Sequence, residues 1–292
     1  IILYLKSNKV IKVFHGSLGS KKLNLLFKIF KPNNIFFFEH GSAWNLDKLS
    51  IPIAKQHANL SKVIIANSNA TKILLVKKFN IPKNKITIIN YGYEIKKQYK
   101  KVNNKKFTVG FLGRFDAHKG AHIFLEAAKF LKNKNFVFKI AGDGQFREHY
   151  FNKYSNLSNI IFCGRISNPL KFINRLDCLA IPSIREPLGL VAVEAGIVNT
   201  AVIASCVDGL PEVILHNCGF LIRPSMPLNK FYFDKSIIPM PKKVIDLKKC
   251  NLINPKELDH KLLAKHIVYY SKNNKILKIH RNGLHEHVKK NF

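Results

Sequence analysis

The chain has 292 residues, of which 47% are hydrophobic and 23% are charged, so it can build a packed core and is not disordered throughout. Its 49 basic and 17 acidic residues give a net charge of +32. A composition rich in Lys, Asn, Ile and Phe explains this charge most simply, and a nucleic-acid-binding protein is the alternative. No motif of an RNA- or DNA-binding module accompanies the charge, so we expect no nucleic-acid partner.

The apolar runs are too short for a membrane-spanning helix, which needs about 18 consecutive apolar residues. The 5 cysteines form no C-x-x-C pair, and an odd number argues against a closed disulfide framework. We therefore expect reduced cysteines, a cytoplasmic protein and no zinc site. The chain begins at Ile1 within a strand-like run and without a signal pattern, so the start of its first domain is expected to be missing.

Short apolar runs alternate with helical patterns in the first part of the chain. An amphipathic helix is predicted over 21–31, and His15 is interpreted as the structural end of an early strand. The strands predicted after this helix are 35–38, 62–66 and 86–90. The polar, lysine-rich residues 95–106 are the expected linker.

The alternation is more regular after this linker. The predicted strands are 107–113, 136–142, 159–164, 177–183 and 201–205, with helices between them and a helical end over 256–290. Continuous apolar strands that alternate with helices predict parallel βαβ units with both faces of the sheet covered. The expected class is α/β, with domains over 1–100 and 106–255 and C-terminal helices over 256–292.

Ligands of parallel sheets bind beyond the carboxyl ends of the strands, so the loops there are informative. Arg114 and Lys119 lie in a loop that runs into a helix, an arrangement that suits a diphosphate. Asp143 is interpreted as a turn residue. Glu186 precedes Gly189, which would let a ligand approach the backbone closely.

Two glutamates eight positions apart give the most specific signal. Glu186 lies in a loop and Glu194 lies in the predicted helix that follows, within the segment REPLGLVAVEAG. This segment resembles the E-x7-E motif of retaining glycosyltransferases of family 4, the group 1 glycosyl transferases with the GT-B fold. The segments FLGRFDAHKG, FKIAGDG, IIFCGRI and AVIASCVDGLPEVI are similar to the neighbouring segments of that family, in unbroken order over roughly residues 62–223.

The resemblance implies two Rossmann-like domains, with the N-terminal one incomplete and an insertion at about 224–255. It implies transfer of a sugar from a UDP- or GDP-sugar to a sugar or lipid-linked acceptor with retained configuration, as in polysaccharide or lipopolysaccharide synthesis. No D-x-D pair occurs in the matching region, so neither a metal ion nor another cofactor is expected. The alternatives are another GT-B-like enzyme, such as an epimerase or a phosphorylase, and an inactive remnant.

The resemblance also implies which residues are catalytic. Arg114 and Lys119 would hold the diphosphate and stabilise the charge of the leaving group. Glu186 would contact the donor sugar. His40 follows a predicted strand, at a position where the family often places a histidine that faces the sugar or the acceptor.

Other residues are implied to bind the nucleotide. Glu194 would bind the ribose hydroxyls, and Arg165 and Ile166 would lie against the base. Gly189 and Leu190 would offer backbone N–H groups to a phosphate at the start of a helix.

The helix predicted over 21–31 suggests a contact with an anionic membrane. Leu23, Leu26, Phe27 and Phe30 form one apolar stripe, and lysines flank it. A peripheral position on the cytoplasmic face of the membrane would suit a lipid-linked acceptor. The alternative is that this stripe packs on the sheet of a Rossmann-like domain.

Overall fold

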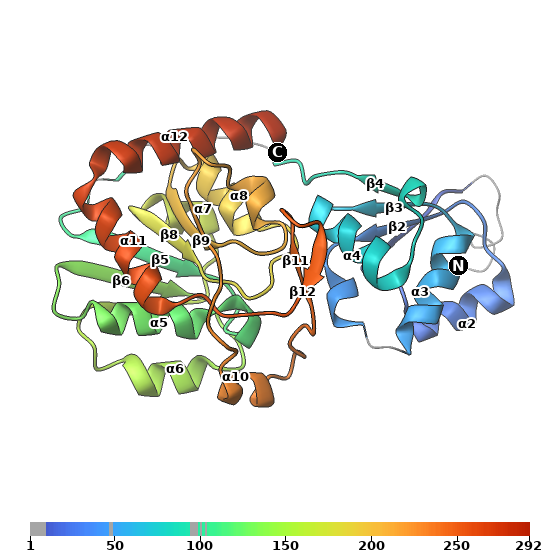
Figure 1. Ribbon diagram of the computed structural model, residues 1–292, viewed down its shortest axis with the longest axis horizontal. Helices are drawn as coiled ribbons and strands as arrows, with labels where there is room; N and C mark the ends of the chain where they lie inside the picture. The colour runs from blue at the N-terminus through green and yellow to red at the C-terminus, as the bar shows by residue number, and fades with distance from the viewer. Residues whose placement is uncertain (1–9, 47–48, 94–98, 100, 103) are drawn as a thin grey trace. The chain divides into compact units, whose positions relative to one another are not determined.

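The computed structural model describes residues 10–46, 49–93, 99, 101–102 and 104–292, and it divides the chain into two compact units (Figure 1). Unit 1 consists of the described residues up to Tyr91 together with Ile245–Ile253, and unit 2 consists of Gly92–Val244 and Asn254–Phe292. The strand expected at the first residues and much of the expected linker lie outside the described residues. Within the described part of the chain, no helix is both long enough and apolar enough to cross a membrane.

Unit 1 is built on a parallel sheet with the strand order β1-β2-β3-β4. Its strands are β1 (Lys12–His15), β2 (Ile35–Glu39), β3 (Ser61–Ala66) and β4 (Ile86–Ile88). Its helices are α2 (Lys21–Phe30), η1 (Ser42–Asn45), α3 (Ser50–Leu60), α4 (Asn69–Phe79) and η2 (Lys83–Lys85). Every strand predicted within the described residues of this part is therefore present, and β1 ends at His15 as expected.

The expectation that both faces of every sheet are covered is wrong for unit 1. Ile35, Phe37 and Ile64 are fully buried in the core of the unit, whereas Phe36 and Phe38 on the opposite face of β2 are partly exposed. Strands that follow one another in sheet order, joined by right-handed crossovers, place all their helices on one side. In the described residues α2, α3 and α4 thus cover a single face of this sheet.

Helix α2 carries apolar side chains on both its inner and its outer side. Ser20 caps the helix by accepting a hydrogen bond from the Leu23 backbone N–H at 3.3 Å. Phe27 is only 3% exposed and contacts the ring of Phe37 in the core of unit 1. Phe27 therefore packs on the sheet, as the alternative predicted, and the outward-facing apolar side chains are Leu25 and Ile29, which are 61% and 60% exposed.

Unit 2 contains a six-stranded parallel sheet with the order β10-β9-β8-β5-β6-β7. The strands are β5 (Phe107–Leu112), β6 (Phe136–Ala141), β7 (Ile160–Gly164), β8 (Cys178–Ile181), β9 (Ala201–Ser205) and β10 (Phe220–Ile222). The helices are η3 (Ala117–Lys119), α5 (Ala121–Phe130), α6 (Arg147–Tyr154), α7 (Pro169–Asn174), α8 (Leu190–Ile197), α9 (Leu210–Val213), α10 (Lys230–Lys235), α11 (His260–Lys272) and α12 (Asn274–Asn291). The predicted alternation of strands and helices is confirmed for this unit.

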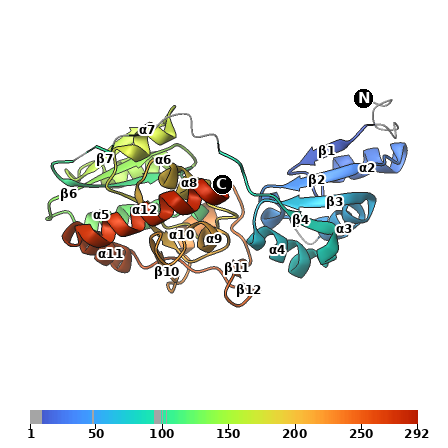
Figure 2. The ribbon, with the colours of Figure 1, turned by 90° about the horizontal axis from the view of Figure 1, so that it is seen from above.

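The core of unit 2 lies between the sheet and the helices that cover it (Figure 2). Phe111, Phe124 and Phe138 are buried together where α5 packs on β5 and β6. The helical end predicted over 256–290 is two helices, α11 and α12, and α12 packs on α8 and β9. The C-terminal helix α12 therefore packs against α8, which carries Glu194 of the E-x7-E segment.

The expected insertion at about 224–255 contributes to both units. Its hairpin of β11 (Val244–Asp246) and β12 (Asn251–Ile253) was not predicted, and most of it is grouped with unit 1. Ile245 is fully buried in the core of that unit, and β12 packs against α4. The division of the chain thus differs from the expected contiguous domains, because one short hairpin returns to unit 1.

Candidate functional site

The candidate site of unit 2 lies where its strand order reverses. The chain runs from β5 outward to β6 and β7, and then returns to place β8 on the other side of β5. Ligands of open parallel sheets bind at such a switch point, beyond the carboxyl ends of the two strands. Here the loop after β5 and the loop after β8 meet, since the backbone N–H of Ile184 donates to the carbonyl of His118 at 2.8 Å.

The loop after β5 carries two of the predicted cations. Arg114 is 57% exposed and forms an ion pair with Asp116, with its Nε 3.2 Å from Oδ2. Gly120 has φ +73° and lies so close to the carbonyl of Pro182 that any side chain would collide with it. Burial and the neighbouring cations hold the pKa of His118 far below its ordinary value. His118 is therefore neutral and adds no charge to the neighbouring Arg114 and Lys119.

Lys119 and Glu186 meet across the switch point. Lys119 Nζ lies 2.7 Å from Glu186 Oε2, and Ser183 Oγ donates to the same oxygen at 3.2 Å. The lysine is only partly exposed and the glutamate is 8% exposed, so the pair is weakly screened by solvent. The structure thus brings together two residues that the sequence placed in separate loops, 67 positions apart.

The backbone of Glu186 is held by a residue that the sequence analysis missed. Asp208 is fully buried, and its Oδ2 accepts a hydrogen bond from the Glu186 N–H at 2.8 Å. Gly209 N donates to the carbonyl of Glu186 at 3.0 Å, so the loop after β9 forms hydrogen bonds with both the N–H and the carbonyl of Glu186. The available signal was the position of Asp208, which follows a predicted strand at the same edge of the sheet.

Helix α8 begins at the site and carries the second glutamate. Gly189 precedes the helix with φ +100°, a conformation that favours glycine, and Leu190 is its first residue. Glu194 lies one turn further along, on the same side of the helix as Leu190. Burial raises the pKa of Glu194 from its ordinary value of 4.5 to about 7. A carboxyl group that is costly to ionise in this way is typical of a ligand site.

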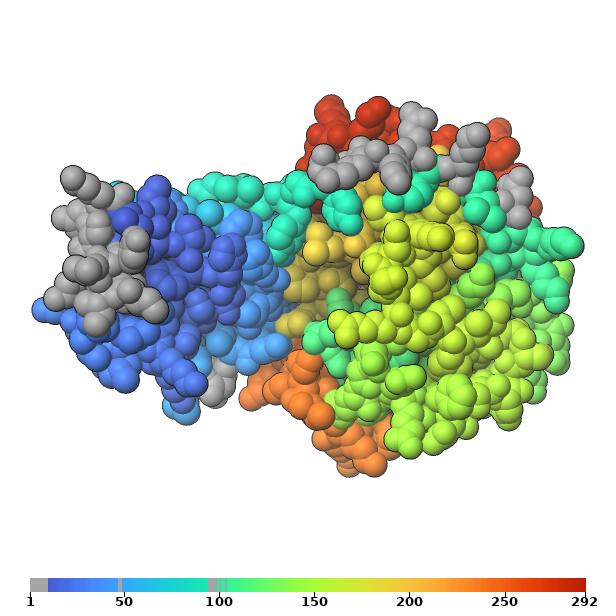
Figure 3. Space-filling model, turned by 180° about the vertical axis from the view of Figure 1, so that it is seen from behind, coloured from blue at the N-terminus to red at the C-terminus, as the bar shows by residue number. Residues whose placement is uncertain are grey.

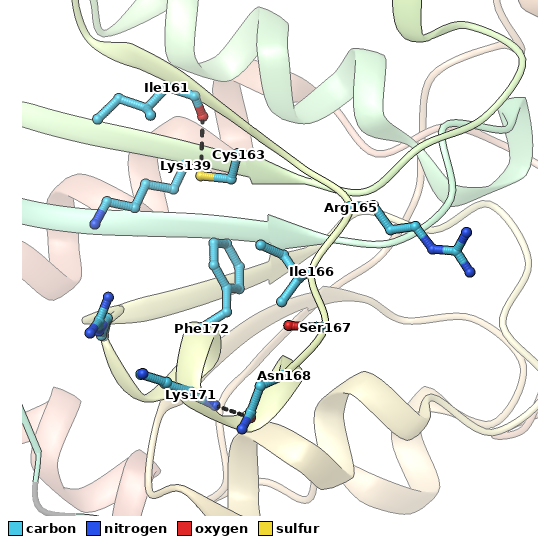
Figure 4. A pocket seen from close by; sticks show the side chains of 10 residues that line it. Lys139, Ile161, Cys163, Arg165, Ile166, Ser167, Asn168, Lys171 and Phe172 are labelled. Carbon is cyan, nitrogen blue, oxygen red and sulfur yellow. Dashed lines mark hydrogen bonds between the residues drawn. The ribbon is translucent and has the colours of Figure 1, made fainter.

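Arg165 and Ile166 lie apart from this cluster. They follow β7, at the outer edge of the sheet, and they line a pocket of about 540 Å³ (Figure 4). The loops connect through the backbone, because Gly142 N donates to the carbonyl of Gly164 at 2.8 Å. The predicted contact of Arg165 and Ile166 with a base stays a prediction.

His40 belongs to unit 1 and is part of a ladder of rings at the carboxyl edge of that sheet. His15 Nδ1 and His40 Nε2 are 2.9 Å apart, and His40 Nδ1 is hydrogen-bonded to the hydroxyl of Tyr91. Phe38 stacks on His40 with 4.4 Å between the ring centroids. Burial and the neighbouring His15 lower the pKa of His40, so this side chain is neutral at pH 7.

Glu39 holds the loop that presents His40. Its carboxylate is fully buried and accepts hydrogen bonds from the backbone N–H groups of Gly41 and Ala43, at 2.7 and 3.0 Å, and from Ser42 Oγ. Burial raises the pKa of Glu39 despite these donors. His15 and Tyr91, the partners of His40, were not predicted as site residues, although both follow predicted strands.

Comparison with known proteins agrees with the geometry of unit 2. Residues 93–228 match the family model described as glycosyl transferases group 1. An uncharacterised 41.2 kDa protein of the cps region of Klebsiella pneumoniae is 32% identical over 199 residues, which is 64% of this chain and 54% of that protein. The capsular polysaccharide biosynthesis glycosyltransferase CapM of Staphylococcus aureus is 24% identical over 180 residues, which is 54% of this chain and 47% of CapM. The chain thus spans about half the length of the curated relatives it matches.

Solved structures extend the likeness to both units. The crystal structure of Anabaena HepE in complex with UDP and glucose matches with a TM-score of 0.73 and 17% identity, over 96% of this chain and 74% of HepE. This likeness concerns the fold, which is expected to persist at such low identity. The chain therefore has the two Rossmann-like units of GT-B glycosyltransferases, and its sequence similarity to the group 1 glycosyl transferases lies in residues 93–228.

Proposed function

We propose that the chain is part of a retaining glycosyltransferase whose unit 2 binds a nucleotide-sugar, with UDP or GDP as the nucleotide. The observation that carries this proposal is the Lys119–Glu186 pair at the switch point, beside Arg114 and the start of α8. Fixed cations and free helix N–H groups at one point favour a diphosphate. The match of residues 93–228 to the group 1 glycosyl transferases supports the same function.

In this proposal the cations of the loop after β5 drive the loss of the leaving group. The bond between the anomeric carbon and the β-phosphate oxygen breaks, and negative charge develops on that oxygen. Arg114 and Lys119 stabilise this charge in place of a metal ion. The acceptor hydroxyl attacks the same face of the sugar from which the diphosphate departs, so the configuration is retained.

Glu186 would orient the donor sugar during this step. Its Oε2 is occupied by Lys119 and Ser183, and both donors fix the plane of the carboxylate. The other oxygen, Oε1, can then accept hydrogen bonds from sugar hydroxyls in one orientation. Such fixed acceptors reduce the entropy that must be lost to reach the reactive geometry.

The acceptor is proposed to be a sugar, either free in a growing polysaccharide or linked to a lipid. CapM is named for capsular polysaccharide biosynthesis, which supports an acceptor of this class. His40 would face the acceptor or the donor sugar, because it directly follows β2 at the carboxyl edge of the sheet of unit 1. Both ring nitrogens of His40 have partners in the structure, so a substrate hydroxyl would replace His15 at Nε2, where a neutral imidazole can donate or accept a hydrogen bond.

The donor site is tested by calorimetry with UDP and GDP in EDTA. Binding of one of the two without a metal ion supports the proposal, and a strict requirement of both for Mg²⁺ contradicts the assignment of Arg114 and Lys119. Transfer is tested with a panel of radiolabelled UDP- and GDP-sugars and a mixture of glycan and lipid-linked acceptors. The anomeric configuration of any product, determined by NMR, decides between retention and inversion.

A peripheral contact with an anionic membrane is part of the proposal and involves the outer side of α2. Leu25, Leu26 and Ile29 are exposed there, and the exposed Lys21 and Lys28 flank them. Apolar side chains beside lysines favour the interface of an anionic bilayer, and each lysine contributes about 1 kcal/mol near it. The five cysteines, all within the described residues, are not joined in disulfides, which is typical of a reducing compartment and supports the cytoplasmic face of the membrane.

Sedimentation with phosphatidylglycerol vesicles tests this contact. The chain is expected to sediment with the vesicles at low salt, and a Leu25→Ser/Ile29→Ser variant is expected to remain in the supernatant. Phosphatidylcholine vesicles are the uncharged control. Equal sedimentation of the variant and the parent chain would exclude the outer side of α2 as the contact.

A further inference from the structure

A basic pocket in unit 2 is separate from the Lys119–Glu186 cluster. It encloses about 540 Å³ and is formed by β6, β7 and α7. Its floor includes Lys139 and Ile161, and its wall includes Lys171 and Phe172 of α7 (Figure 4). The segment that forms it is exposed on the face of unit 2 seen in Figure 3, where it is yellow-green. A volume of this size suits a small organic ligand.

The pocket exists because α7 is too short to cover the edge of the sheet. This helix has six residues, and it packs against α8, toward the other end of the sheet. Strand β7 is the edge strand, and its Ile161 is 46% exposed as a result. The floor of the pocket is thus an apolar sheet surface that no described helix covers.

The side chains around this floor carry one sign of charge. Lys139, Arg165, Lys171 and Arg175 line the pocket, and no aspartate or glutamate is among the lining residues. Within the described part of the chain, none of the four forms an ion pair with a carboxylate. Four cations around one concave surface repel each other, and an anion between them would remove this repulsion.

The charges are divided between the two ends of the pocket. Figure 4 shows Arg165, on the loop after β7, pointing away from Lys139 and Lys171. Figure 4 shows Lys139 beside Ile161 and Cys163 on the strands, and Lys171 across the pocket on α7. Ammonium groups on two sides of one pocket suit a phosphate, and the ring of Phe172 with Ile161 suits an apolar or flat body.

We propose that the part of this pocket between β6, β7 and α7 binds a small organic phosphate, a phosphomonoester carried on an apolar body. The phosphate lies between Lys139 and Lys171, and the body of the ligand covers Ile161 and Phe172. Lys139, Lys171, Ile161 and Phe172 are not assigned to the donor, whereas Arg165 and Ile166 of the same pocket are predicted to contact its base, so the proposed site adjoins the donor site.

The probe is phenyl phosphate, compared with inorganic phosphate and benzyl alcohol by calorimetry, first without UDP and then with saturating UDP. Phenyl phosphate is expected to bind at one site at least about tenfold more tightly than inorganic phosphate, because burial of the ring adds apolar contact. Lys139→Gln and Lys171→Gln are each expected to weaken it about tenfold or more. Lys132→Gln, an exposed lysine outside the pocket, is the matched control and is expected to change nothing.

A second readout uses Cys163, which lines the pocket. Phenyl phosphate is expected to slow the alkylation of Cys163, followed by mass spectrometry of its peptide, and not that of the exposed Cys250. Loss of phenyl phosphate binding when UDP is added would assign the binding to the donor site and overturn the proposal. The absence of saturable phenyl phosphate binding would also overturn the proposal. Equal affinity for phenyl phosphate in Lys171→Gln and Lys132→Gln would overturn it as well, and this comparison can be made whether or not the chain binds UDP.

Discussion

Ionisation of Glu194 is expected to control the affinity for the nucleotide. Burial raises the pKa of this carboxyl to about 7, and the proposed contact with the ribose hydroxyls requires the ionised form as a double acceptor. About one tenth of the carboxyl is ionised at pH 6 and about nine tenths at pH 8. Because only the ionised fraction binds, the dissociation constant for a nucleotide-sugar should be about tenfold larger at pH 6 than at pH 8.

The assay is calorimetry with UDP-glucose between pH 6 and pH 8, or with GDP-mannose if the guanine nucleotide is preferred. A nucleotide-sugar is chosen because its diphosphate diester does not titrate in this range. Binding at pH 6.5 should release protons, which makes the observed enthalpy depend on the ionisation enthalpy of the buffer. Glu194→Gln should bind about tenfold more weakly than the parent chain at pH 8 and should lose the pH dependence.

The same carboxyl should affect stability with the opposite sign. Its pKa in the folded state exceeds the ordinary value of 4.5, so the folded chain holds more protons than the unfolded chain between about pH 4.5 and 7. The free energy of unfolding therefore falls as the pH rises through this window, by at most about 3 kcal/mol. Glu194→Gln should remove this loss and be more stable than the parent chain at pH 8, measured by urea denaturation.

The two signs together separate a binding role from a purely structural one. If Glu194→Gln gains stability and loses affinity for the nucleotide-sugar, the buried carboxylate contributes to ligand binding at a cost in stability. An affinity for UDP-glucose that is constant between pH 6 and 8, or that keeps its pH dependence in Glu194→Gln, would refute the reasoning.

Three further predictions concern the backbone and the charges of the switch point. Glu186→Gln should lower turnover about 10- to 100-fold, with little change in the affinity for UDP, because it loses a charged acceptor that faces the sugar; full activity would contradict the assignment. Asp208→Ala should lower turnover in the same way by leaving the buried Glu186 N–H without its acceptor, and Asp208→Asn should restore it, which kcat and KM measurements check. Gly120→Ala should lower the free energy of unfolding by more than about 2 kcal/mol, because the new Cβ would collide with a carbonyl. Gly164 also has a positive φ but has open space around it, so Gly164→Ala should lower the free energy of unfolding by only about 1 kcal/mol, measured by urea denaturation. Equal losses in the two glycine variants would show that the collision is relieved.

The strands that were predicted in the two sheets are continuous apolar runs, which need no information from their neighbours, whereas the three-residue β10 was not predicted. The run 136–142 is an example, and it became β6 almost unchanged. The three-residue strands β11 and β12 were not predictable, since VID and NLI are too short to show a period and pair only with each other. Local pattern thus determines an element only when the element is long enough to display it.

The orientation of α2 shows a second limit. Its sequence places apolar residues on more than one side, so a stripe through Phe27 and a surface around Leu25 and Ile29 both fit a helix. Periodicity does not decide which side packs on the sheet. That decision depends on the positions of Phe14 and Phe37, whose rings lie within 5.3 and 6.3 Å of the ring of Phe27.

The sequence predicted candidate site residues one by one, but it did not predict their contacts. Lys119 and Glu186 were assigned from their loops, whereas their ion pair depends on β8 lying next to β5, which is a property of the strand order. Asp208 was missed because a buried carboxylate that holds a backbone N–H has no local signature. The pairing of His15 with His40 likewise requires β1 and β2 to be neighbours.

The return of the β11–β12 hairpin to unit 1 has a consequence for synthesis on the ribosome. Unit 1 is encoded first, yet Ile245 fills a fully buried place in its core and β12 covers part of α4. The unit cannot finish folding when Tyr91 leaves the exit tunnel, because this piece is translated only after most of unit 2. In the nascent chain, unit 1 therefore stays incomplete until Ile253 has emerged, and the part of α4 that β12 covers is exposed to solvent until then. A chaperone could bind this exposed surface during synthesis.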